Sequence, residues 1–404
     1  MEGVCRLSVE PRQDTAVGGQ GYTVDSQMRS FWEVNAWSEA DVVIVGGGLV
    51  GVQTALAVIK RQPTARVVVL ERGLMPTGAS TRNAGFACIG SVSEVAADLD
   101  LLGTDAAVEI VRRRYDGLRR LLETCAGYDV GYVRDGGHEI FLEDHPSIER
   151  IDELNELLRP ITGATTFEQR DDLVANFGFS PKVKHLVTSP VEGTVHSGKL
   201  VSVLWGLAQR AGVMIRTGAN VTSITDSHDN VEISVRSVGG DWMIRAGAVI
   251  VATNAWIPEL VSTGEASQIQ PARGQILVTE PIPGMPLAGS FHYDEGYVYF
   301  RPVGNRILLG GARNLAFEEE RTTSHDVTES IQGALETLLR EVIAPSHPQL
   351  KIEYRWAGTM GFSPSKHPIV ERISPHVTVA FGCNGMGVAL SSETAERIAE
   401  VRNY

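Results

Sequence analysis

A glycine-rich turn near the N-terminus constrains the fold of this 404-residue chain more than any other feature. The turn, Gly46–Gly51, reads GGGLVG and lies between an apolar run at Asp41–Val45 and a helical pattern over Leu49–Lys60. A second apolar run, Arg66–Leu70, follows. Strand, helix and strand within about thirty residues form a βαβ unit, which requires a parallel sheet. The pattern therefore predicts an α/β fold.

The spacing of the glycines predicts what this turn binds. Gly46 allows a tight turn, Gly48 lets a pyrophosphate approach the backbone, and Gly51 lets the helix pack closely on the strand. The N-terminus of a helix beginning near Leu49 would face the phosphates. Glu71 ends the second strand, twenty residues after Gly51. A carboxylate there accepts hydrogen bonds from the ribose and repels a 2′-phosphate. The segment therefore predicts a bound dinucleotide and disfavours NADP.

Charge and cysteine content limit the class of protein. Lys and Arg number 36 and Asp and Glu 49, so the net charge of −13 suits a soluble protein and disfavours nucleic acid as a partner. The four cysteines form no CxxC motif and no metal-ligand cluster, which fits a reducing cytosol. The sequence shows neither a signal peptide nor a run of about 18 apolar residues. We expect a cytoplasmic protein with no metal site and no membrane span.

The remaining segments predict a second sheet and several helices. Strand patterns are clearest at Pro271–Glu280 and Gly296–Ala312, and they suggest an antiparallel sheet. Residues 1–30 read as an irregular arm, and the aromatic segment Ser30–Trp37 as one that packs on a domain or caps a cofactor site. Further helices are expected over Ala106–Cys125, Ile148–Leu158, Val195–Ala211, Val327–Val342 and Val388–Val401.

Four later motifs carry a resemblance to a known family. They are GASTRNAGF (Gly78–Phe86), ATNAW (Ala252–Trp256), WAGTMGFSPSKHPIV (Trp356–Val370) and FGCNGMGVALS (Phe381–Ser391). In this order and spacing they resemble the FAD-dependent D-amino-acid oxidase (DAO) family, which includes glycine and sarcosine oxidases and γ-glutamylputrescine oxidases. The resemblance extends from about Trp32 to the end of the chain.

The resemblance implies a Rossmann-type FAD-binding domain that is discontinuous in sequence, and an α+β substrate domain built on an antiparallel sheet. The implied boundaries are residues 1–38 for the arm, 39–95, 185–256 and 352–404 for the FAD-binding domain, and 96–184 and 257–351 for the substrate domain. The implied reaction oxidises the C–N bond of a small amine or amino acid by hydride transfer to flavin N5, and the imine is then hydrolysed. Either dioxygen or an electron carrier would reoxidise the flavin.

The resemblance also implies that FAD is bound without a covalent bond. Gly358 stands where sarcosine oxidases carry a cysteine, and residues 81–83 read Thr-Arg-Asn where dimethylglycine-dehydrogenase-like proteins use a histidine. The last helix could point its N-terminus at the flavin, or its glycines could serve the turn alone. The expected contacts with FAD are Gly46, Gly48, Leu49, Val50, Gly51, Glu71, Arg72, Gly78, Ala79, Ser80, Arg82, Asn83, Ala84, Gly85, Val221, Ala252, Thr253, Trp256, Gly358, Gly382, Asn384, Gly385, Met386 and Gly387.

The candidate substrate residues lie in and before the strand YVYFRP. Arg301 would pair with a substrate carboxylate or form a salt bridge elsewhere. Tyr297 and Tyr299 share a face with Arg301 in a regular strand, so they would line the pocket or pack as ordinary strand aromatics. His292 would transfer a proton or serve the structure.

Three other basic side chains have two interpretations each. Arg273 would hold a polar edge of the flavin or substrate, or serve the structure. Lys366 and His367 lie on a loop that is near the flavin in this family, and they would promote the reaction with oxygen or remain solvated. Cys88 and Cys383 read as small buried apolar residues close to the flavin segments.

The direction of Arg301 separates two classes of substrate. If it faces the pocket, we expect a small amino acid such as glycine, sarcosine or a D-amino acid. If it does not, a polyamine derivative fits better. Two rival functions stay open, a Rossmann dehydrogenase that uses NAD and a non-enzymatic protein that binds FAD as a structural element.

Overall fold

The computed structural model describes residues 30–365, 367–382 and 384–402. Glu39–Tyr404 form one compact unit, and the chain up to Ser38 forms another. In the latter the structure describes helix α1 (Phe31–Trp37), which begins at a capping box. The Ser30 hydroxyl accepts a hydrogen bond from the Glu33 backbone N–H at 3.2 Å, and the Glu33 carboxylate accepts one from Ser30 N–H at 2.6 Å. The packing of this aromatic segment on a domain stays a prediction.

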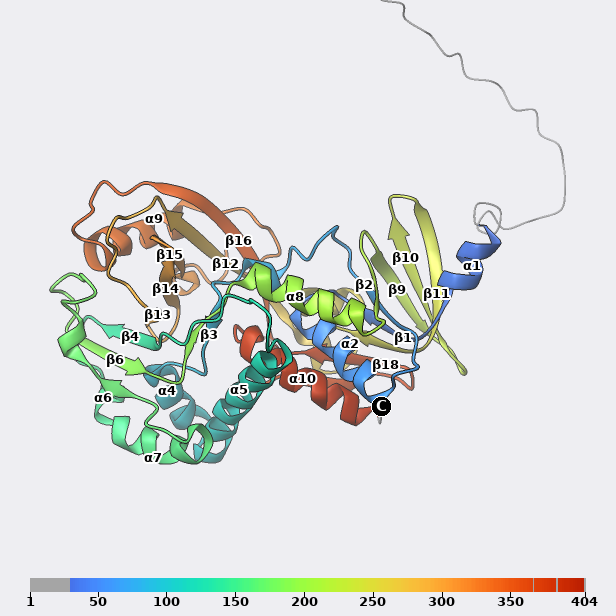
Figure 1. The fold of residues 1–404 in the computed structure, drawn as a ribbon, viewed down its shortest axis with the longest axis horizontal. Helices are drawn as coiled ribbons and strands as arrows, with labels where there is room; N and C mark the ends of the chain where they lie inside the picture. Colours follow the sequence, from blue (N-terminus) through green and yellow to red (C-terminus); the bar gives the residue numbers. More distant parts are fainter. Residues whose placement is uncertain (1–29, 366, 383, 403–404) are drawn as a thin grey trace, which may run out of the picture. The chain divides into compact units, whose positions relative to one another are not determined.

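The first sheet of the larger unit contains the predicted βαβ strands (Figure 1). Its order β17-β18-β11-β1-β2-β8 is parallel from β18 to β8, while β17, β10 and β9 add antiparallel strands. Its strands are β1 (Glu39–Val45), β2 (Val67–Leu70), β8 (Met214–Arg216), β9 (Asn220–Asp226), β10 (Val231–Ser237), β11 (Gly240–Val251), β17 (Ile369–Arg372) and β18 (Val377–Phe381).

The apolar runs of β1 and β2 are continuous because both faces of this sheet are buried. Val42 and Ile44 pack in the core on the side of helices α2 (Leu49–Arg61), α8 (Ser197–Arg210) and α10 (Gly387–Val401). Val43 and Val45 point to the other side and pack with apolar residues of β9 and β10. Successive side chains of a strand alternate between the two faces, so every position in these runs is apolar.

The second sheet is antiparallel except where β13 runs parallel to β4. Its order is β16-β12-β15-β14-β13-β4-β6-β5. Gly310, Tyr299, His292 and Glu139 occupy one register row across four neighbouring strands. The strands are β4 (Gly137–Phe141), β5 (Glu168–Gln169), β6 (His185–Ser189), β12 (Gln270–Thr279), β13 (Ser290–Tyr293), β14 (Val298–Val303), β15 (Arg306–Gly311) and β16 (Ile352–Phe362).

The other elements connect or cover the two sheets. Helix α9 lies over the second sheet, and its apolar face packs on that sheet's core (Figure 1). The remaining helices are α3 (Ala79–Arg82), α4 (Val92–Leu102), α5 (Thr104–Thr124), α6 (Pro146–Glu149), α7 (Ile151–Thr162) and α9 (Glu329–Leu338). The short elements are β3 (Phe86–Ala87), β7 (Gly193–Thr194), η1 (Asp171–Leu173), η2 (Asn254–Glu259), η3 (Glu265–Gln268), η4 (Arg313–Leu315) and η5 (Leu339–Ile343).

Three helical segments differ from the prediction. The predicted helix Ile148–Leu158 is interrupted at Arg150, so α6 and α7 are separate. The helix expected over Val327–Val342 continues past Leu338 only as a π-helical turn. Helix α4 was not predicted, although its Ser91 hydroxyl accepts a hydrogen bond from Glu94 N–H, as an N-cap does.

The division into an FAD-binding and a substrate domain stays a proposal. Two segments assigned to the FAD-binding domain, β6 and the first part of the 352–404 segment that forms β16, pair with strands of the second sheet. We therefore propose that sheet membership sets the boundaries, which places β6 and β16 in the substrate domain.

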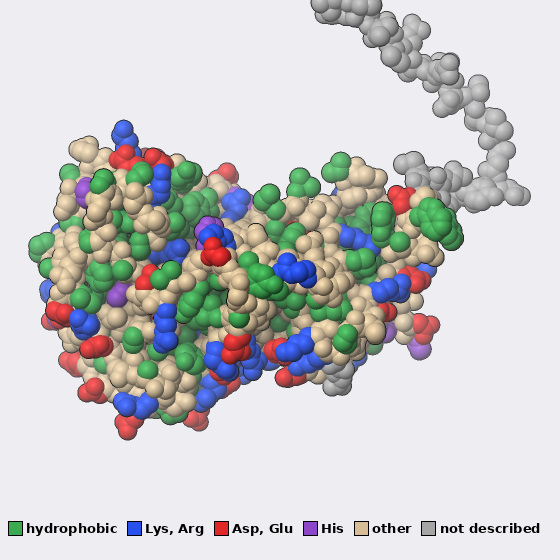
Figure 2. All heavy atoms as spheres, viewed as in Figure 1, with side chains coloured by type: hydrophobic (Ala, Val, Ile, Leu, Met, Phe, Trp, Pro, Cys, Tyr) green, Lys and Arg blue, Asp and Glu red, His purple; other side chains and the backbone are tan. Residues whose placement is uncertain are grey.

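The surface shown in Figure 2 mixes acidic and basic side chains over residues 39–402. Within the described residues, no helix is long and apolar enough to cross a membrane.

Candidate active site

A cavity of about 490 Å³ lies where the two sheets meet. It is lined by the ends of β1, β2 and β11, by the loop that carries α3, and by the start of α10. Residues of β12, β13, β14 and β16 line its opposite wall. Binding sites of open α/β sheets lie outside the carboxyl ends of the parallel strands, and this cavity begins there.

The glycine turn after β1 has the geometry of a dinucleotide-binding turn. Gly46 has φ +109°, and a Cβ there would lie 2.6 Å from the carbonyl oxygen of Ala252. A Cβ on Gly51 would overlap the carbonyl oxygen of Gly46, so this glycine lets α2 pack on β1. Gly51 thus lies behind the cavity wall, whereas Gly46, Gly48 and Leu49 line the cavity.

Glu71 lies at the end of β2 and lines the cavity, as predicted. Its two oxygens accept hydrogen bonds of 2.9 Å from the backbone N–H groups of Gly47 and Gly73. These bonds orient the carboxylate, and each oxygen keeps a second lone pair for a ribose hydroxyl. The role of Glu71 toward a ribose stays a prediction.

The loop Gly78–Phe86 is held to the second sheet by hydrogen bonds with strand β16. Arg82 donates a hydrogen bond of 2.7 Å to the Ala357 carbonyl, and the Trp356 indole donates one of 3.0 Å to the Arg82 carbonyl. The Asn83 amide donates to the carbonyls of Ala79 and Ser80, each at 2.9 Å. Arg82 and Asn83 line the cavity, but these polar groups already serve the shape of the loop.

The turn before α10 also lines the cavity, from Asn384 to Ala389. Asn384 and Gly385 have positive φ of 47° and 86°, which explains glycine at the second position. Gly382 does not line the cavity, so its predicted contact with FAD is corrected. A Cβ there would overlap the Thr394 hydroxyl, which shows that this glycine allows α10 to pack on β18.

The other predicted contacts fall on the cavity wall. Trp256 lies under the Arg72 guanidinium, 4.2 Å from the ring centroid. Thr253 has a buried hydroxyl oxygen without a hydrogen-bond partner in the described residues, which suits a polar ligand. The predicted cofactor residues not yet placed that line the cavity are Val50, Ala84, Gly85, Val221, Gly358, Met386 and Gly387.

Two tyrosines and a histidine line the far wall of the cavity. Tyr297, Tyr299 and His292 all contribute to the lining, and their roles toward a substrate stay predictions. Burial raises the pKa of Tyr299 to about 12, so its hydroxyl stays protonated and can donate. Burial lowers the pKa of His292 to about 4, so the ring is neutral at physiological pH. Both of its ring nitrogens are buried, and neither has a hydrogen-bond partner in the part of the chain that the structure describes.

Arg301 does not line the cavity, which corrects its predicted position. Its guanidinium donates hydrogen bonds to the carbonyls of Gly85 (2.8 Å) and Val195 (3.1 Å). Arg301 and Tyr299 are on the same face of β14, as expected. At Arg301, however, that face contacts the loop Gly78–Phe86 on the side away from the cavity. Arg301 therefore fastens this loop to the second sheet.

Arg313 is the arginine of this region that lines the cavity, and the sequence reasoning missed it. It follows β15, and its guanidinium lies 4.4 Å from the ring centroid of Phe362, 5.1 Å from Phe317 and 5.5 Å from Tyr297. Burial lowers its pKa, and no carboxylate of the described residues pairs with it. In the sequence, Arg313 is indicated only by its position directly after a strand, in the stretch GGAR that ends at this residue.

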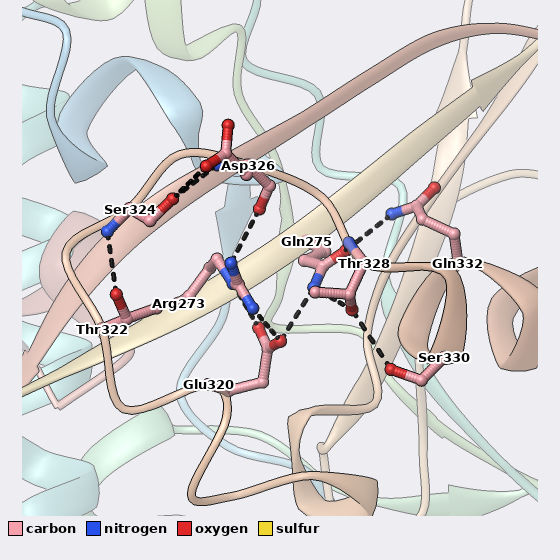
Figure 3. Close-up of polar contacts among 9 residues, drawn as sticks. All are labelled: Arg273, Gln275, Glu320, Thr322, Ser324, Asp326, Thr328, Ser330 and Gln332. Atoms are coloured by element: carbon pink, nitrogen blue, oxygen red, sulfur yellow. Dashed lines mark hydrogen bonds and ion pairs between the residues drawn. The ribbon is translucent and has the colours of Figure 1, made fainter.

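Arg273 has a structural role (Figure 3). Its guanidinium forms a buried ion pair with Glu320 at 2.6 Å and donates a hydrogen bond of 3.0 Å to the Asp326 carbonyl. Gln275 of the same strand donates to Glu320 at 2.9 Å and accepts from Thr328 N–H. The network fastens the segment between η4 and α9 onto β12.

Four candidates remain, and the structure describes two of them. Lys366 and Cys383 lie outside the described residues. His367 does not line the cavity, and its carbonyl accepts hydrogen bonds from Ser363 and Asn384. Cys88 is buried and lines the cavity.

Comparison with known proteins identifies the family. The sequence profile of the FAD-dependent oxidoreductases (DAO) matches residues 41–401, nearly the whole larger unit. The chain belongs to this family. Its cofactor is accordingly FAD, and its chemistry is that of an amine or amino-acid oxidoreductase. The cavity fits such a cofactor, because its glycine turn leaves the backbone open to a phosphate.

The most similar proteins cover most of the chain. "Probable oxidoreductase OrdL" of Rhizobium meliloti (strain 1021) is 27% identical over 90% of this chain and 83% of its own length. The γ-glutamylputrescine oxidoreductase of Escherichia coli (strain K12) is 26% identical over 92% of this chain and 85% of its own. The crystal structure of glycine oxidase from Geobacillus kaustophilus shares the fold, with a TM-score of 0.70 at 22% identity over 91% of this chain and 95% of that one.

Proposed function

We propose that this protein oxidises the C–N bond of a small amine that carries a carboxylate, and that Arg313 binds this carboxylate. Bound FAD supplies the hydride acceptor. The amine gives up a hydride from its α-carbon and a proton from its nitrogen, and water hydrolyses the resulting imine to a carbonyl compound and ammonia or a smaller amine.

One observation carries the choice of substrate. The Arg313 guanidinium lines the cavity without a carboxylate partner among the described residues, and aromatic rings surround it. Placing a charge away from water without a partner costs free energy. A site with such an unpaired guanidinium therefore favours an anionic ligand. The planar guanidinium matches a carboxylate with two parallel hydrogen bonds.

The tyrosines on the same wall would complete the substrate site. Tyr299 is on β14, which lies between β13, the strand of His292, and β15, the strand that precedes Arg313. Its protonated hydroxyl can donate a hydrogen bond to a carboxylate oxygen, and Tyr297 packs against Phe317 beside Arg313. Tyr299 would orient the amine rather than exchange a proton with it, because a phenol with a pKa of about 12 is hardly ever ionised at neutral pH.

We propose that FAD is bound without a covalent bond. Gly358 lines the cavity beside Arg82 and has no side chain with which to form a bond. Release of yellow FAD from protein denatured in acid tests this, and flavin that remains with the precipitated chain would contradict it.

The experiment for the proposed function follows flavin absorbance. The purified yellow protein is mixed without oxygen with glycine, sarcosine, D-amino acids and polyamine derivatives, and bleaching identifies a substrate. Bleaching by carboxylate-bearing amines supports the proposal. If amines without a carboxylate are oxidised equally well, Arg313 has no role in binding. Hydrogen peroxide formed in air then distinguishes dioxygen from an electron carrier as the oxidant.

Replacing Arg313 gives a direct test. We expect Arg313→Ala to raise KM for the carboxylate substrate about hundredfold, because a charged hydrogen-bonded pair contributes about 2–3 kcal/mol. The matched control is Arg321→Ala in the same segment, whose guanidinium pairs with exposed Glu318 at 3.2 Å. An unchanged KM in Arg313→Ala would contradict the proposed role.

A cytoplasmic location stays part of this proposal. Its support is that Cys88 and Cys125 are both free and buried. Reduced thiols are the ordinary state in the cytosol.

A further inference from the structure

The lining of the cavity includes a second set of polar side chains. These residues, which we call the polar compartment, come from β13, from helices α4 and α5, and from the residue that follows β3. Its members are Cys88, Glu94, Asp98, Arg114 and His292. The proposed oxidation uses none of them.

The compartment lies beside the candidate substrate site. The ring of Phe86 lies 5.9 Å from the ring of Tyr299 and 5.1 Å from that of His292, edge to face in both cases. Tyr299 and His292 are also register neighbours on β14 and β13. A substrate held beside Tyr299 can therefore extend toward His292 within the same cavity.

Two members of the compartment are buried and have unsatisfied hydrogen-bonding atoms. His292 is 7% exposed, and neither of its ring nitrogens has a hydrogen-bond partner among the described residues. Arg114 is 8% exposed, and its Nε–H has no partner among them either. Buried polar atoms of native proteins nearly always have partners, because an unpaired one costs free energy. A ligand in the compartment would therefore gain affinity by supplying these hydrogen bonds.

The charged groups of the compartment already have partners. The Arg114 guanidinium pairs with Glu94 at 2.9 Å and donates a hydrogen bond of 3.1 Å to the Ile89 carbonyl. Asp98 also has an interaction partner. Burial raises the pKa of the Cys88 thiol, so the thiol is uncharged at neutral pH. An ion that entered the compartment would lose its water without meeting a free counter-charge, and the compartment therefore favours an uncharged group.

The unsatisfied atoms can donate as well as accept. The Nε–H of Arg114 can only donate. Burial lowers the pKa of His292 to about 4, so its imidazole is neutral and has one donor nitrogen and one acceptor nitrogen. The χ2 torsion of a histidine is broad, so a small rotation of the ring turns a nitrogen toward a ligand. A primary carboxamide matches both side chains, because it is uncharged and has an acceptor oxygen and an N–H₂ donor.

We propose that the polar compartment is a second substrate subsite, which binds a carboxamide at the far end of the amine being oxidised. The carboxamide oxygen accepts a hydrogen bond from Nε–H of Arg114, and the carboxamide N–H₂ donates one to His292. This inference rests on the proposed function and narrows its substrates to carboxylate-bearing amines with a distal carboxamide.

The test compares ligands that differ only at the far end of a chain. Each set is built on glycine, carries a chain of fixed length on the nitrogen or on the α-carbon, and ends in a carboxamide, isopropyl, carboxylate or aminomethyl group. Calorimetry measures binding to the holoenzyme with its flavin reduced beforehand, so that no turnover adds heat. We expect the best carboxamide to bind about tenfold more tightly than its isopropyl isostere, as a hydrogen bond to a buried group allows.

Two results of this comparison would overturn the subsite. One is equal affinity of the carboxamide and the isopropyl compound in every set, because the unsatisfied atoms would then bind nothing. The other is tighter binding of the carboxylate or the ammonium compound than of the carboxamide, because the compartment would then select a charge.

Replacing His292 locates the effect. His292→Phe keeps a buried ring and removes both unpaired nitrogens, so the preference for the carboxamide should fall about tenfold. Stability toward urea should not fall, because no hydrogen bond within the described chain is lost. An unchanged preference would overturn the assignment. A marked loss of stability would also overturn it, because His292 would then serve the structure.

His138→Phe is the matched control. His138 is also a buried histidine of the second sheet, but it does not line the cavity, and its Nδ1 forms a hydrogen bond of 3.0 Å with the Thr188 hydroxyl. This variant should keep the preference for the carboxamide. A loss of preference as large as in His292→Phe would show that the effect does not come from the compartment.

A second readout separates this inference from the proposed function. The same compounds are mixed with the oxidised holoenzyme without oxygen, and flavin absorbance is followed. Tighter binding of the carboxamides without bleaching by any compound contradicts the proposed oxidation but supports the subsite. Bleaching together with equal affinities in every set supports the oxidation and overturns the subsite.

Discussion

At the scale of single residues, helix α2 can pack on strand β1 only because Gly51 has no side chain. A Cβ at this position would overlap the Gly46 carbonyl oxygen, and that carbonyl belongs to the turn that faces the cavity. We therefore expect both the stability of the protein and its binding of the cofactor to depend on the absence of a side chain at Gly51.

We expect Gly51→Ala to destabilise the protein by about 2–3 kcal/mol, since an overpacked core position forces the backbone to shift. FAD affinity should fall in parallel. Urea unfolding and the flavin content of the purified protein measure the two effects. The control is Gly333→Ala in α9. A Cβ there meets nothing within 4 Å, so this variant should stabilise the protein by about 1 kcal/mol. Equal stability of the two variants would contradict the argument.

At the scale of elements, the segment from η4 to α9 matters because Arg313 lies at its start. The buried pair of Arg273 and Glu320 holds the middle of this segment, with side-chain exposures of 5% and 2%. The position of the candidate carboxylate-binding group thus depends on a pair that does not line the cavity.

We expect Glu320→Ala to lower the free energy of unfolding by about 3–5 kcal/mol, because it leaves Arg273 buried without a partner. KM for the substrate should rise while the absorbance of bound flavin stays unchanged. Glu341→Ala is the control, since its pair with Lys182 is exposed and should matter little. Urea unfolding together with steady-state kinetics checks both, and a wild-type KM would show that the segment does not position Arg313.

At the scale of the whole molecule, burial of carboxyl groups between the sheets and the helices links stability to pH. Burial raises the pKa of Glu192 to about 8 and that of Glu139 to about 7, from a usual 4.5. Between the usual and the raised pKa values, these two groups therefore bind more protons in the folded state than in the unfolded state. The contribution of these two groups to stability is greatest below their usual pKa and is lost as pH rises through the raised pKa values.

We expect the free energy of unfolding to decrease from pH 5 to about pH 8, with a slope for one group of at most about 1.4 kcal/mol per pH unit. Glu192→Gln should flatten the profile, because a neutral amide oxygen can still accept from Ile89 and Gly90. Urea unfolding at several pH values measures this. Exposed Glu123→Gln should leave the slope as it is, and an equal slope in both variants would refute the linkage.

The sequence by itself determined the features that depend on near neighbours in the chain. The βαβ unit, its glycine turn and Glu71 lie within one short stretch, where spacing fixes geometry. The strand pattern over Gly296–Ala312, which forms the antiparallel pair β14–β15, was predicted for the same reason. The family motifs extended the prediction to the loop Gly78–Phe86 and to the turn before α10, because each motif is itself contiguous.

The tertiary structure decided which side chains reach the cavity. Arg301 and Arg313 both belong to the β14–β15 region, and strand alternation alone could not show that the first contacts the loop Gly78–Phe86 while the second lines the cavity. Residues of α4, α5 and β13, which are distant in sequence, also line this cavity together. Such groups meet only through packing, because a local pattern records the face of an element but not what that face contacts.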